Sequence, residues 1–349
     1  MSVHVPLTFR VEHCPAAEHA AVPGSDTFTD GRLPEFPGPG HSGERLGDHE
    51  LGKAVAHVGP MPRIGVVIRP EWPPERLRGY AAAVEAAGLD DVWLWEDCFF
   101  SGGVAAASAA LAATSSVRVG LGLMPAPLRN PVLAAMEISG LDRLYPGRFV
   151  PAAGHGVLPW MEQVGAAAAS PMGLLREWVP AVRALLRGET VTVSGEYVRL
   201  DRVTLDWPPP GPVPPLLVGA RGPKTLALAG ELADGLVLDA SLTAAGVARA
   251  VARSAAGQPA ARSAEVVVYL PSGSAPGSAD RILAQLSNPA DPLPERTALG
   301  TPAEVAAAIR AYADAGATTV ALQPTPDDPD IEGTLRLAAA ARAHLHGEG

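Results

Sequence analysis

Lysine and cysteine are nearly absent from this chain of 349 residues. Each occurs twice, as Lys53 and Lys224 and as Cys14 and Cys98. Two cysteines cannot supply the several disulfides that hold small secreted domains together. No apolar run is long enough to cross a bilayer, and the N-terminal residues lack the basic-then-apolar order of a signal peptide. We therefore expect a cytoplasmic protein without a membrane partner.

Positive charge is also in short supply. Lys and Arg number 27 against 37 Asp and Glu, which gives a net charge of −10 at pH 7. A protein that binds nucleic acid or an anionic membrane needs a basic face to attract that polyanion. The charge balance argues against both partners, and a small organic substrate is the expected one.

Residues 1–60 differ from everything after them. They mix His, Pro, Gly and acidic residues, as in LPEFPGPGHSGERLGDHE, without the periodicity of a helix or a strand. We interpret them as a disordered or dispensable N-terminal extension, with a docking tail as the alternative. The catalytic domain is expected to cover residues 61–349.

From Arg63 onward, apolar runs rich in β-branched residues alternate with Ala/Leu-rich segments, which is the pattern of a parallel α/β fold. Strands are predicted at Ile64–Arg69, Asp91–Trp95, Val117–Leu123, Arg148–Ala153, Leu216–Ala220, Gly235–Asp239, Glu265–Leu270 and Thr318–Gln323. Helices between them include Pro74–Ala87, Val104–Ala113, Val132–Leu144, Lys224–Ala233 and Ala303–Ala315. Eight such units suit a closed (β/α)8 TIM barrel. No GxGxxG turn follows the first strand, as an open dinucleotide-binding sheet would require.

Three segments exceed what a minimal barrel needs. Gly122–Pro131, dense in Gly and Pro, follows the third strand, and Val157–Gly173 follows the fourth. Thr190–Leu205 alternates apolar and polar residues around Ser194-Gly195, which predicts an inserted hairpin. Insertions after barrel strands commonly shape the substrate pocket.

The active site of a barrel lies at the C-terminal ends of its strands. Glu96, Asp97 and Cys98 follow the second predicted strand. Adjacent carboxylates beside a thiol can exchange protons or accept hydrogen bonds, so we assign all three as catalytic candidates. A solvated turn with a buried cysteine is the alternative.

His155 follows the fourth strand and is the single histidine between Met61 and the C-terminal His344. Gly154 and Gly156 flank it, and glycines let the backbone approach a ligand closely. An imidazole titrates near neutral pH, so His155 is a further catalytic candidate. A histidine with a purely structural role is the alternative.

A possible anion site follows the fifth predicted strand. The turn into the next helix consists of Gly219, Ala220, Arg221, Gly222, Pro223 and Lys224. Pro223 suits the first helical position, and the free backbone amides of a helix N-terminus attract anions. We therefore assign this turn to phosphate or another ligand anion, with an ordinary turn bearing surface cations as the alternative.

Taken in order, these clusters resemble the bacterial-luciferase-like superfamily of flavin- and F420-dependent oxidoreductases. The resemblance runs from about Arg63 to Thr325. It is carried by DDVWLWED, TSSVRVGLGLMPAPLRNP, LYPGRFVPAAGHG, LLVGARGPKTLALAGELADGLVL and GTPAEVAAAIRAYADAGATTVAL. It implies a luciferase-like barrel that holds coenzyme F420, or alternatively FMN, at its mouth, and it implies a homodimer.

The resemblance also implies roles for particular residues. A bulge at Gly122, Leu123 and Met124 is expected behind the coenzyme ring, with a non-proline cis peptide between Gly122 and Leu123. Residues expected to contact the coenzyme also include Gly154, Gly156, Gly219, Ala220, Arg221, Gly222 and Lys224. Residues assigned to an apolar substrate pocket are Arg129, Trp160 and Met161. No metal site is predicted.

One departure from the family bears on the reaction. F420-dependent alcohol and sugar-phosphate dehydrogenases of this superfamily carry Asp-His after the second strand, with the histidine as base, whereas Cys98 follows Asp97 here. A thiol with an ordinary pKa of about 8.5 is a poor base at neutral pH. We therefore expect hydride transfer from reduced F420 to an organic substrate, with His155 able to supply a proton.

Three alternatives stay open at this point. The first is a reduced-FMN-dependent monooxygenase on the same fold. The second is a Schiff-base aldolase with Lys224 as the amine, although this lysine lies past a helix entry and not on a strand. The third is a catalytically silent flavin-binding protein.

Overall fold

The computed structural model describes residues 61–257, 264–285 and 293–347. The chain divides into the units Met1–Ser42 and Gly43–Gly349, and all described residues belong to the second. The extension predicted at residues 1–60 lies outside the described residues.

Eight parallel strands close into a barrel in the order β1-β10-β9-β8-β7-β4-β3-β2. They are β1 (Arg63–Val67), β2 (Asp91–Leu94), β3 (Arg118–Pro125), β4 (Phe149–Gly154), β7 (Leu217–Gly219), β8 (Gly235–Leu238), β9 (Glu265–Pro271) and β10 (Thr319–Gln323). Every strand coincides with a predicted apolar run, with its ends shifted by at most two residues. The predicted (β/α)8 barrel is therefore confirmed.

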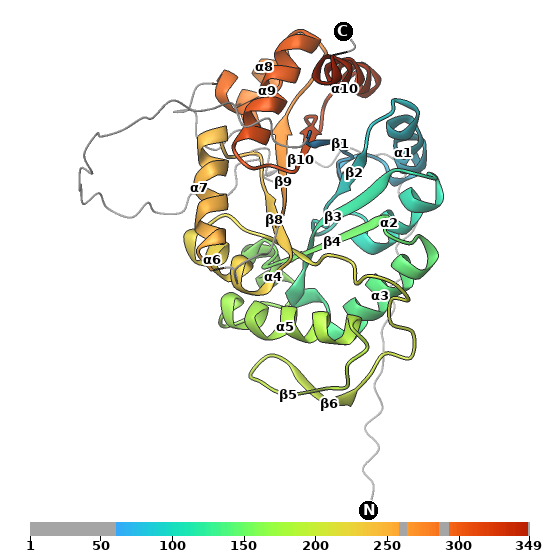
Figure 1. Ribbon diagram of the computed structural model, residues 1–349, viewed down its shortest axis with the longest axis vertical. Coiled ribbons are helices and arrows are strands. Elements are labelled where there is room, and N and C mark those ends of the chain that lie inside the picture. The colour runs from blue at the N-terminus through green and yellow to red at the C-terminus, as the bar shows by residue number, and fades with distance from the viewer. Residues whose placement is uncertain (1–60, 258–263, 286–292, 348–349) are drawn as a thin grey trace, which may run out of the picture. The chain divides into compact units, whose positions relative to one another are not determined.

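Helices surround the barrel and connect its strands (Figure 1). The connecting helices are α1 (Leu77–Ala86), α2 (Gly103–Ala112), α3 (Pro131–Leu144), α5 (Pro171–Leu186), α6 (Pro223–Leu232), α7 (Ala244–Ala255) and α9 (Pro302–Asp314). The helix α10 (Ile331–His346) follows the last strand, β10. Two shorter helices, α4 (Leu158–Gln163) and α8 (Ser278–Gln285), follow β4 and β9.

The three segments that exceed a minimal barrel take different forms. After β3, a single 3-10 turn at Ala126–Leu128 leads into α3. After β4, the helix α4 precedes α5. The predicted hairpin is present as β5 (Val191–Ser194) and β6 (Arg199–Val203), which pair antiparallel between α5 and β7. Figure 1 shows this hairpin outside the barrel, beside α5.

Proline begins α3, α5, α6 and α9, because its fixed φ and missing N–H suit the first helical position. Three of these helices have a side-chain cap, in which Asn130, Ser170 or Thr301 accepts a hydrogen bond from a first-turn amide. The fourth, α6, is preceded by Gly222 and has no side-chain cap. Its first amides are therefore left for another acceptor.

The barrel interior is filled by its own side chains. The buried inner cluster consists of Val67, Trp93, Val150, Ala152, Leu217, Val237, Val267, Tyr269 and Ala321. Trp93 is the bulkiest member, and its ring leaves no room for a side chain on the adjacent β3. A Cβ at Gly120 would lie 2.3 Å from that ring, so this strand position requires glycine.

A buried ionic network connects several strands at the end of the barrel where the strands begin. Asp91 is fully buried and accepts a hydrogen bond from Arg63 at 2.9 Å. Arg118 donates to both oxygens of Asp91, at 3.0 and 2.8 Å, and also pairs with Glu265 at 2.8 Å. The network thus ties together the first residues of β1, β2, β3 and β9.

We predict that Asp91→Ala lowers the free energy of unfolding by about 3 kcal/mol, because it leaves two guanidinium groups without their buried partner. Urea unfolding measures the change. The control is Asp201→Ala, whose ion pair with Arg202 is exposed on both sides and should contribute less than about 0.5 kcal/mol. Equal losses in the two variants would contradict the prediction.

Candidate active site

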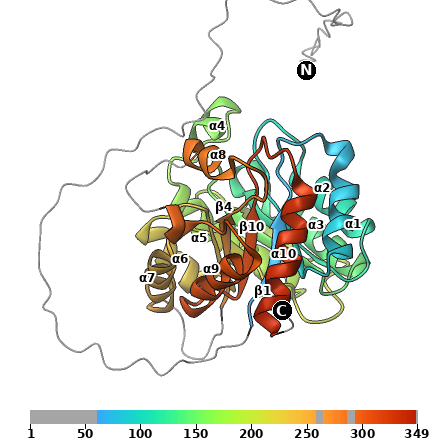
Figure 2. The same ribbon diagram turned by 90° about the horizontal axis from the view of Figure 1, so that it is seen from above.

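The mouth of the barrel lies at the C-terminal strand ends, where α4 and α8 both project (Figure 2). Trp95, Leu123 and Ala240 are partly buried there and pack against the inner cluster. Trp95 and Ala240 follow β2 and β8, and Leu123 lies near the end of β3, so all three cover the inner cluster at the mouth. We call these three residues the mouth floor.

Strand β3 leaves its regular pairing with β4 between Leu121 and Met124, where the register shifts. This is the bulge expected at Gly122 and Leu123, and the peptide bond between them is cis, as predicted. A second non-proline cis peptide joins Cys98 and Phe99. The Gly122 carbonyl accepts a hydrogen bond from Tyr269 Oη at 2.8 Å, and the Leu123 carbonyl accepts one from the Glu96 amide at 3.1 Å.

The side chain of Leu123 lies between two glycines on neighbouring strands. A Cβ at Gly154 on β4 or at Gly219 on β7 would stand 2.3 Å from Leu123 Cδ2. Both glycines were expected to admit a ligand, and in the structure they admit this leucine. Met124, the next residue, is fully buried in the core between strands and helices, so its side chain does not face the mouth.

Asp97 has no cationic hydrogen-bond partner among the described residues. One of its oxygens accepts a hydrogen bond from Trp95 Nε1 at 2.8 Å. Burial raises the pKa of Asp97 to about 6, a rise that Glu71 assists and that Trp95 and Arg69 oppose. A carboxyl with this pKa exchanges protons close to neutral pH.

Its neighbour Cys98 is partly buried. Burial raises the pKa of the Cys98 thiol, and the charges of Glu96 and Asp97 raise it further. The thiol is therefore protonated at neutral pH, and the reasoning that disfavours it as a base is strengthened.

Glu96 has a different environment from Asp97. Arg129 donates to both of its oxygens, at 2.6 and 2.9 Å, and the Gly103 amide donates to one of them at 2.7 Å. Arg129 also pairs with Glu137 at 3.0 Å. Glu96 and Arg129 thus hold the β2–α2 loop against the start of α3, instead of presenting free charges to a substrate.

His155 lies partly buried at the end of β4, and its Nε2 is 3.3 Å from Thr225 Oγ1 in the first turn of α6. Burial lowers the pKa of His155, and the backbone of Pro171 opposes this shift. Its Nδ1 is buried with no hydrogen-bond partner among the described residues. Gly156 has a φ of 69°, which favours glycine, and its backbone packs against Met161.

The turn from β7 into α6 presents one cation without a partner. Arg221 is exposed and forms an ion pair with Asp239 at the end of β8. Lys224 is exposed, and its side chain has no hydrogen bond or ion pair within the described part of the chain. Ala220 is buried, whereas a Cβ at Gly222 would meet nothing within 4 Å. The position of Lys224 on a helix, outside the mouth floor, disfavours the aldolase alternative.

The apolar residues assigned to the substrate pocket differ in how far their side chains are exposed. Trp160 is partly exposed, whereas Met161 is buried under Gly156. Exposed aromatic side chains occur instead at Phe99 and Phe100, which are 63% and 52% exposed in the loop after β2.

Sequence reasoning did not single out four residues of this region: Arg69, Glu71, Trp95 and Tyr269. Arg69 follows β1, pairs with Glu71 at 2.6 Å and lies 5.2 Å from the centre of the Trp95 ring. A narrow cleft of about 30 Å³ runs between Arg69, Trp72 and Trp95. The available signal was that Arg69 and Glu71 directly follow the first strand, as Asp97 follows the second.

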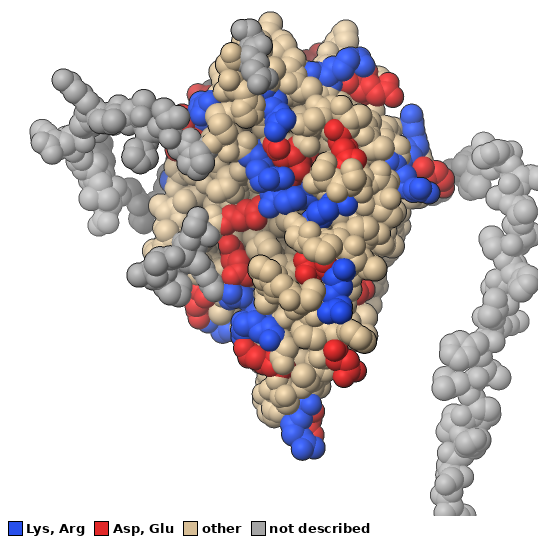
Figure 3. Space-filling view, turned by 45° about the vertical axis from the view of Figure 1, so that its right-hand side comes forward, with Lys and Arg blue, Asp and Glu red and all other residues tan. Residues whose placement is uncertain are grey.

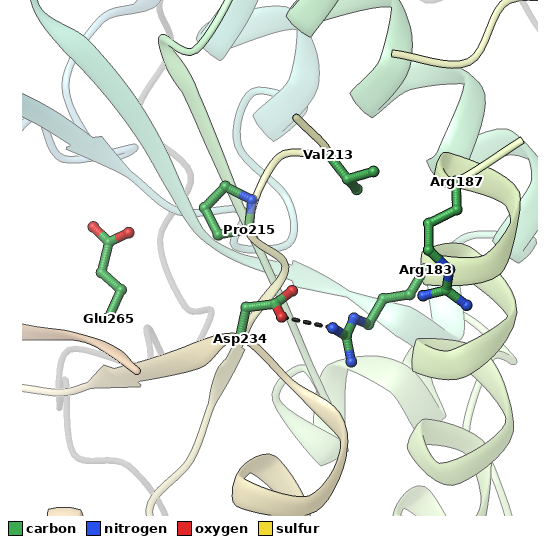
Figure 4. Close-up of a pocket in the computed structure, with 6 residues that line it drawn as sticks. All are labelled: Arg183, Arg187, Val213, Pro215, Asp234 and Glu265. Carbon is green, nitrogen blue, oxygen red and sulfur yellow. Dashed lines mark hydrogen bonds and ion pairs between the residues drawn. The ribbon is translucent and has the colours of Figure 1, made fainter. Parts of the chain in front are cut away.

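A larger cavity, of about 360 Å³, lies at the opposite end of the barrel from the mouth. Its lining includes Pro215, Asp234 and Glu265, which stand where β7, β8 and β9 begin. Arg183 points toward Asp234 across this cavity, and the two form an ion pair at 2.6 Å (Figure 4). None of its lining residues is one of the predicted site residues.

Surface charges of both signs intermingle on the face shown in Figure 3, which has no large area of one sign. No group of three metal-ligating side chains occurs in the described part of the chain. Within the same residues, no helix has the length and apolar character needed to span a bilayer.

The sequence of residues 55–281 matches the family described as luciferase-like monooxygenase. This chain belongs to that family. The resemblance seen in its motifs is therefore confirmed.

Among its luciferase-like relatives is a 5,10-methylenetetrahydromethanopterin reductase of Methanolobus tindarius, 31% identical over 51% of this chain and 54% of the relative. Another is an F420-dependent glucose-6-phosphate dehydrogenase of Nakamurella multipartita, 34% identical over 48% and 52%. The chain thus spans about half the length of the curated relatives it matches.

Solved structures share the fold at low identity. The coenzyme F420-dependent tetrahydromethanopterin reductase of Methanopyrus kandleri aligns with a TM-score of 0.69 at 20% identity, covering 81% of this chain and 99% of that one. The oxygenating constituent of 3,6-diketocamphane monooxygenase of Pseudomonas putida, in complex with FMN, aligns at 0.65 and 17%, covering 80% and 96%. At these identities the likeness shows the luciferase-like barrel alone.

We predict a pH-dependent stability difference between the wild type and Asp97→Asn. The pKa of Asp97 is higher in the folded chain than its ordinary value of 3.8. Its ionisation therefore lowers the free energy of unfolding as pH rises from about 4 to about 6. The uncharged variant escapes this loss and should become more stable than the wild type by about 1–2 kcal/mol above pH 6. Urea unfolding at several pH values tests this, and a difference independent of pH would contradict it.

Proposed function

We propose that this chain is an oxidoreductase that uses reduced coenzyme F420 for hydride transfer to an organic substrate. The observation that carries the proposal is that the apolar mouth floor lies next to the uncapped N-terminus of α6. Leu123 of the mouth floor touches Gly219, and the uncapped N-terminus of α6 follows at Gly222. Coenzyme F420 joins a flat ring to a phosphate-bearing tail, which matches an apolar floor next to an anion site.

The start of α6 fits the anionic tail. Its first-turn amides have no side-chain acceptor, and the space beside Gly222 is open within 4 Å. Lys224 adds a positive charge in the same turn. Helix N-termini stabilise anions through their first-turn amides and the helix dipole, and a nearby ammonium strengthens the interaction. Arg221 contributes less, because Asp239 already neutralises its charge.

The mouth floor fits the ring. Trp95, Leu123 and Ala240 offer an apolar surface backed by the inner cluster, so water is excluded from beneath a flat ligand. When bound, the reduced coenzyme supplies the hydride, while the protein orients it and delivers the proton.

Asp97 is the group that we assign to proton transfer. Its carboxyl has a pKa of about 6, and the Trp95 indole holds it in place. His155 stands at the end of β4, two positions from β2 in the barrel order. Because burial lowers its pKa, His155 is neutral at pH 7, and we assign it to hydrogen bonding with the substrate or coenzyme.

Large apolar side chains around the mouth, which we call the rim, favour an apolar substrate. Phe99 and Phe100 are exposed after β2, and Leu158 and Val164 are 40% and 42% exposed in and beside α4 after β4. Large apolar side chains at the rim of a site favour ligands that bury hydrocarbon or aromatic surface. We propose a substrate less polar than a sugar phosphate.

A titration of the purified protein with F420 and with FMN tests the proposal. Tight F420 binding, followed by oxidation of reduced F420 with an organic acceptor, is the expected result. FMN shares a ring and a phosphate tail, and the fold is shared with an FMN-bound monooxygenase. Preference for FMN together with oxygen uptake would replace the proposal by that alternative, and binding without any turnover would replace it by a catalytically silent flavin-binding protein.

We predict that Lys224→Ala raises the F420 dissociation constant roughly tenfold, which corresponds to about 1.4 kcal/mol. The reason is the loss of the unpaired cation beside the α6 amides. The control is Arg249→Ala, which removes an exposed cation from α7 and should leave the constant unchanged. An unaltered constant in the Lys224 variant would remove this lysine from the coenzyme site.

We also propose that the chain forms a homodimer through α3. Leu133, Met136 and Leu144 are 47%, 56% and 70% exposed on this helix. Their spacing, with Gly140 between them, places them on one face. An exposed apolar helix face of this kind is typical of a subunit interface.

We predict that Met136→Glu converts the dimer into a monomer, because it introduces a charge at the centre of this face. Analytical ultracentrifugation measures the change. Leu283→Glu, which adds the same charge to an exposed leucine on α8, should leave the dimer intact. A monomeric wild type would remove the dimer proposal, and a dimeric Met136 variant would move the interface elsewhere.

A further inference from the structure

Tyr269 brings a hydroxyl group into the apolar interior of the barrel. It belongs to β9 and is 6% exposed. Its ring packs against Trp93, with ring centres 6.1 Å apart, and against Trp95 of the mouth floor, at 5.7 Å. The other side chains of the inner cluster are aliphatic, apart from Trp93. A buried hydroxyl in such surroundings costs free energy unless it has a partner.

The partner of this hydroxyl is the backbone of the bulge. Tyr269 Oη donates to the Gly122 carbonyl at 2.8 Å, across 147 residues of sequence. The carbonyl lies where β3 shifts its register against β4, so a contact from across the barrel fixes a point where the sheet is irregular. A Cβ at Gly122 would stand 2.5 Å from Tyr269 Oη, and glycine is therefore what allows the approach.

The next carbonyl of the bulge is held from another side. Leu123 O accepts a hydrogen bond from the Glu96 amide, and Glu96 is itself fixed by Arg129. The two consecutive carbonyls are thus bonded to residues of β9 and of the loop after β2. These two hydrogen bonds fix the backbone of the bulge, and the backbone in turn sets the position of the Leu123 side chain beside Gly154 and Gly219.

We infer that Tyr269 is a positioning residue for the coenzyme: its hydroxyl fixes the Gly122 carbonyl and thereby holds Leu123 at the height of the mouth floor that the coenzyme ring requires. This inference rests on the coenzyme binding proposed above. Burial and the charge of Asp97 raise the pKa of Tyr269, so the hydroxyl remains a donor throughout the working pH range.

Tyr269→Phe is the variant that tests the inference, because it deletes Oη and keeps the ring contacts with both tryptophans. The matched control is Tyr312→Phe. Tyr312 on α9 is 2% exposed, and its hydroxyl donates to the Leu242 carbonyl at 2.7 Å, outside the barrel interior. Both variants lose a buried tyrosine hydroxyl bonded to backbone carbonyls, which for Tyr312 are those of Leu242 and, at 3.3 Å, Glu295. Of the two residues, Tyr269 is the one that contacts the bulge.

The measurements are the F420 dissociation constant, by absorbance or fluorescence titration, and the melting temperature of each full-length variant. We expect Tyr269→Phe to raise the dissociation constant about fivefold or more, and Tyr312→Phe to leave it within about twofold, at comparable losses of melting temperature. In turnover, the KM for the coenzyme should rise more than kcat falls.

Two outcomes would overturn the inference. One is an F420 dissociation constant of Tyr269→Phe within about twofold of the wild type. The other is a rise in both variants that follows their loss of melting temperature, which assigns Tyr269 a stabilising role alone. A wild type that does not bind F420 is a separate result, because it refutes the proposed function itself and the inference with it.

Discussion

The site depends on the close contact of one leucine with two glycines. Leu123 occupies space that Cβ atoms of Gly154 and Gly219 would fill, so three neighbouring strands are locked in register at the point where β3 is irregular. A barrel mouth built of regular strands would present alternating side chains of many sizes. The bulge places Leu123 in the mouth floor, and Gly219, which Leu123 contacts, lies shortly before the start of α6. The mouth floor and the proposed anion site are therefore linked through the contact of Leu123 with Gly219.

Two adjacent carboxylates show how environment separates roles. Glu96 is paired with Arg129 and accepts a hydrogen bond from a backbone amide, whereas Asp97 is partly buried and accepts a side-chain hydrogen bond from the Trp95 indole. The first arrangement is a structural link between the loop after β2 and the start of α3. The second disfavours ionisation, which costs stability and keeps a proton available near neutral pH. Glu96 thus links two loops, whereas Asp97 is the carboxylate to which we assign proton transfer.

The sequence predicted the barrel well, because strands buried on both faces appear as apolar runs and their helices appear as Ala-rich segments. It also placed Asp97, His155 and the α6 turn at strand ends. It did not predict that Arg129 neutralises Glu96, or that Tyr269 reaches Gly122, because these contacts join residues far apart in the chain and depend on side-chain direction. Met124 illustrates the remaining difficulty, since at an irregular strand end the alternation of faces cannot be counted forward, and this residue points into the core.

The ionic network around Asp91 has a consequence for how this protein changes over time. It secures the strand beginnings, at the end of the barrel away from the mouth, and shares no residue with the floor, the α6 turn or the rim. Substitutions in the loops after the strands therefore leave the main electrostatic anchor of the barrel untouched. During evolution, residues around the mouth of this barrel can therefore be substituted, and the range of substrates can change with them. The ion pairs at the opposite end continue to stabilise the fold while this happens.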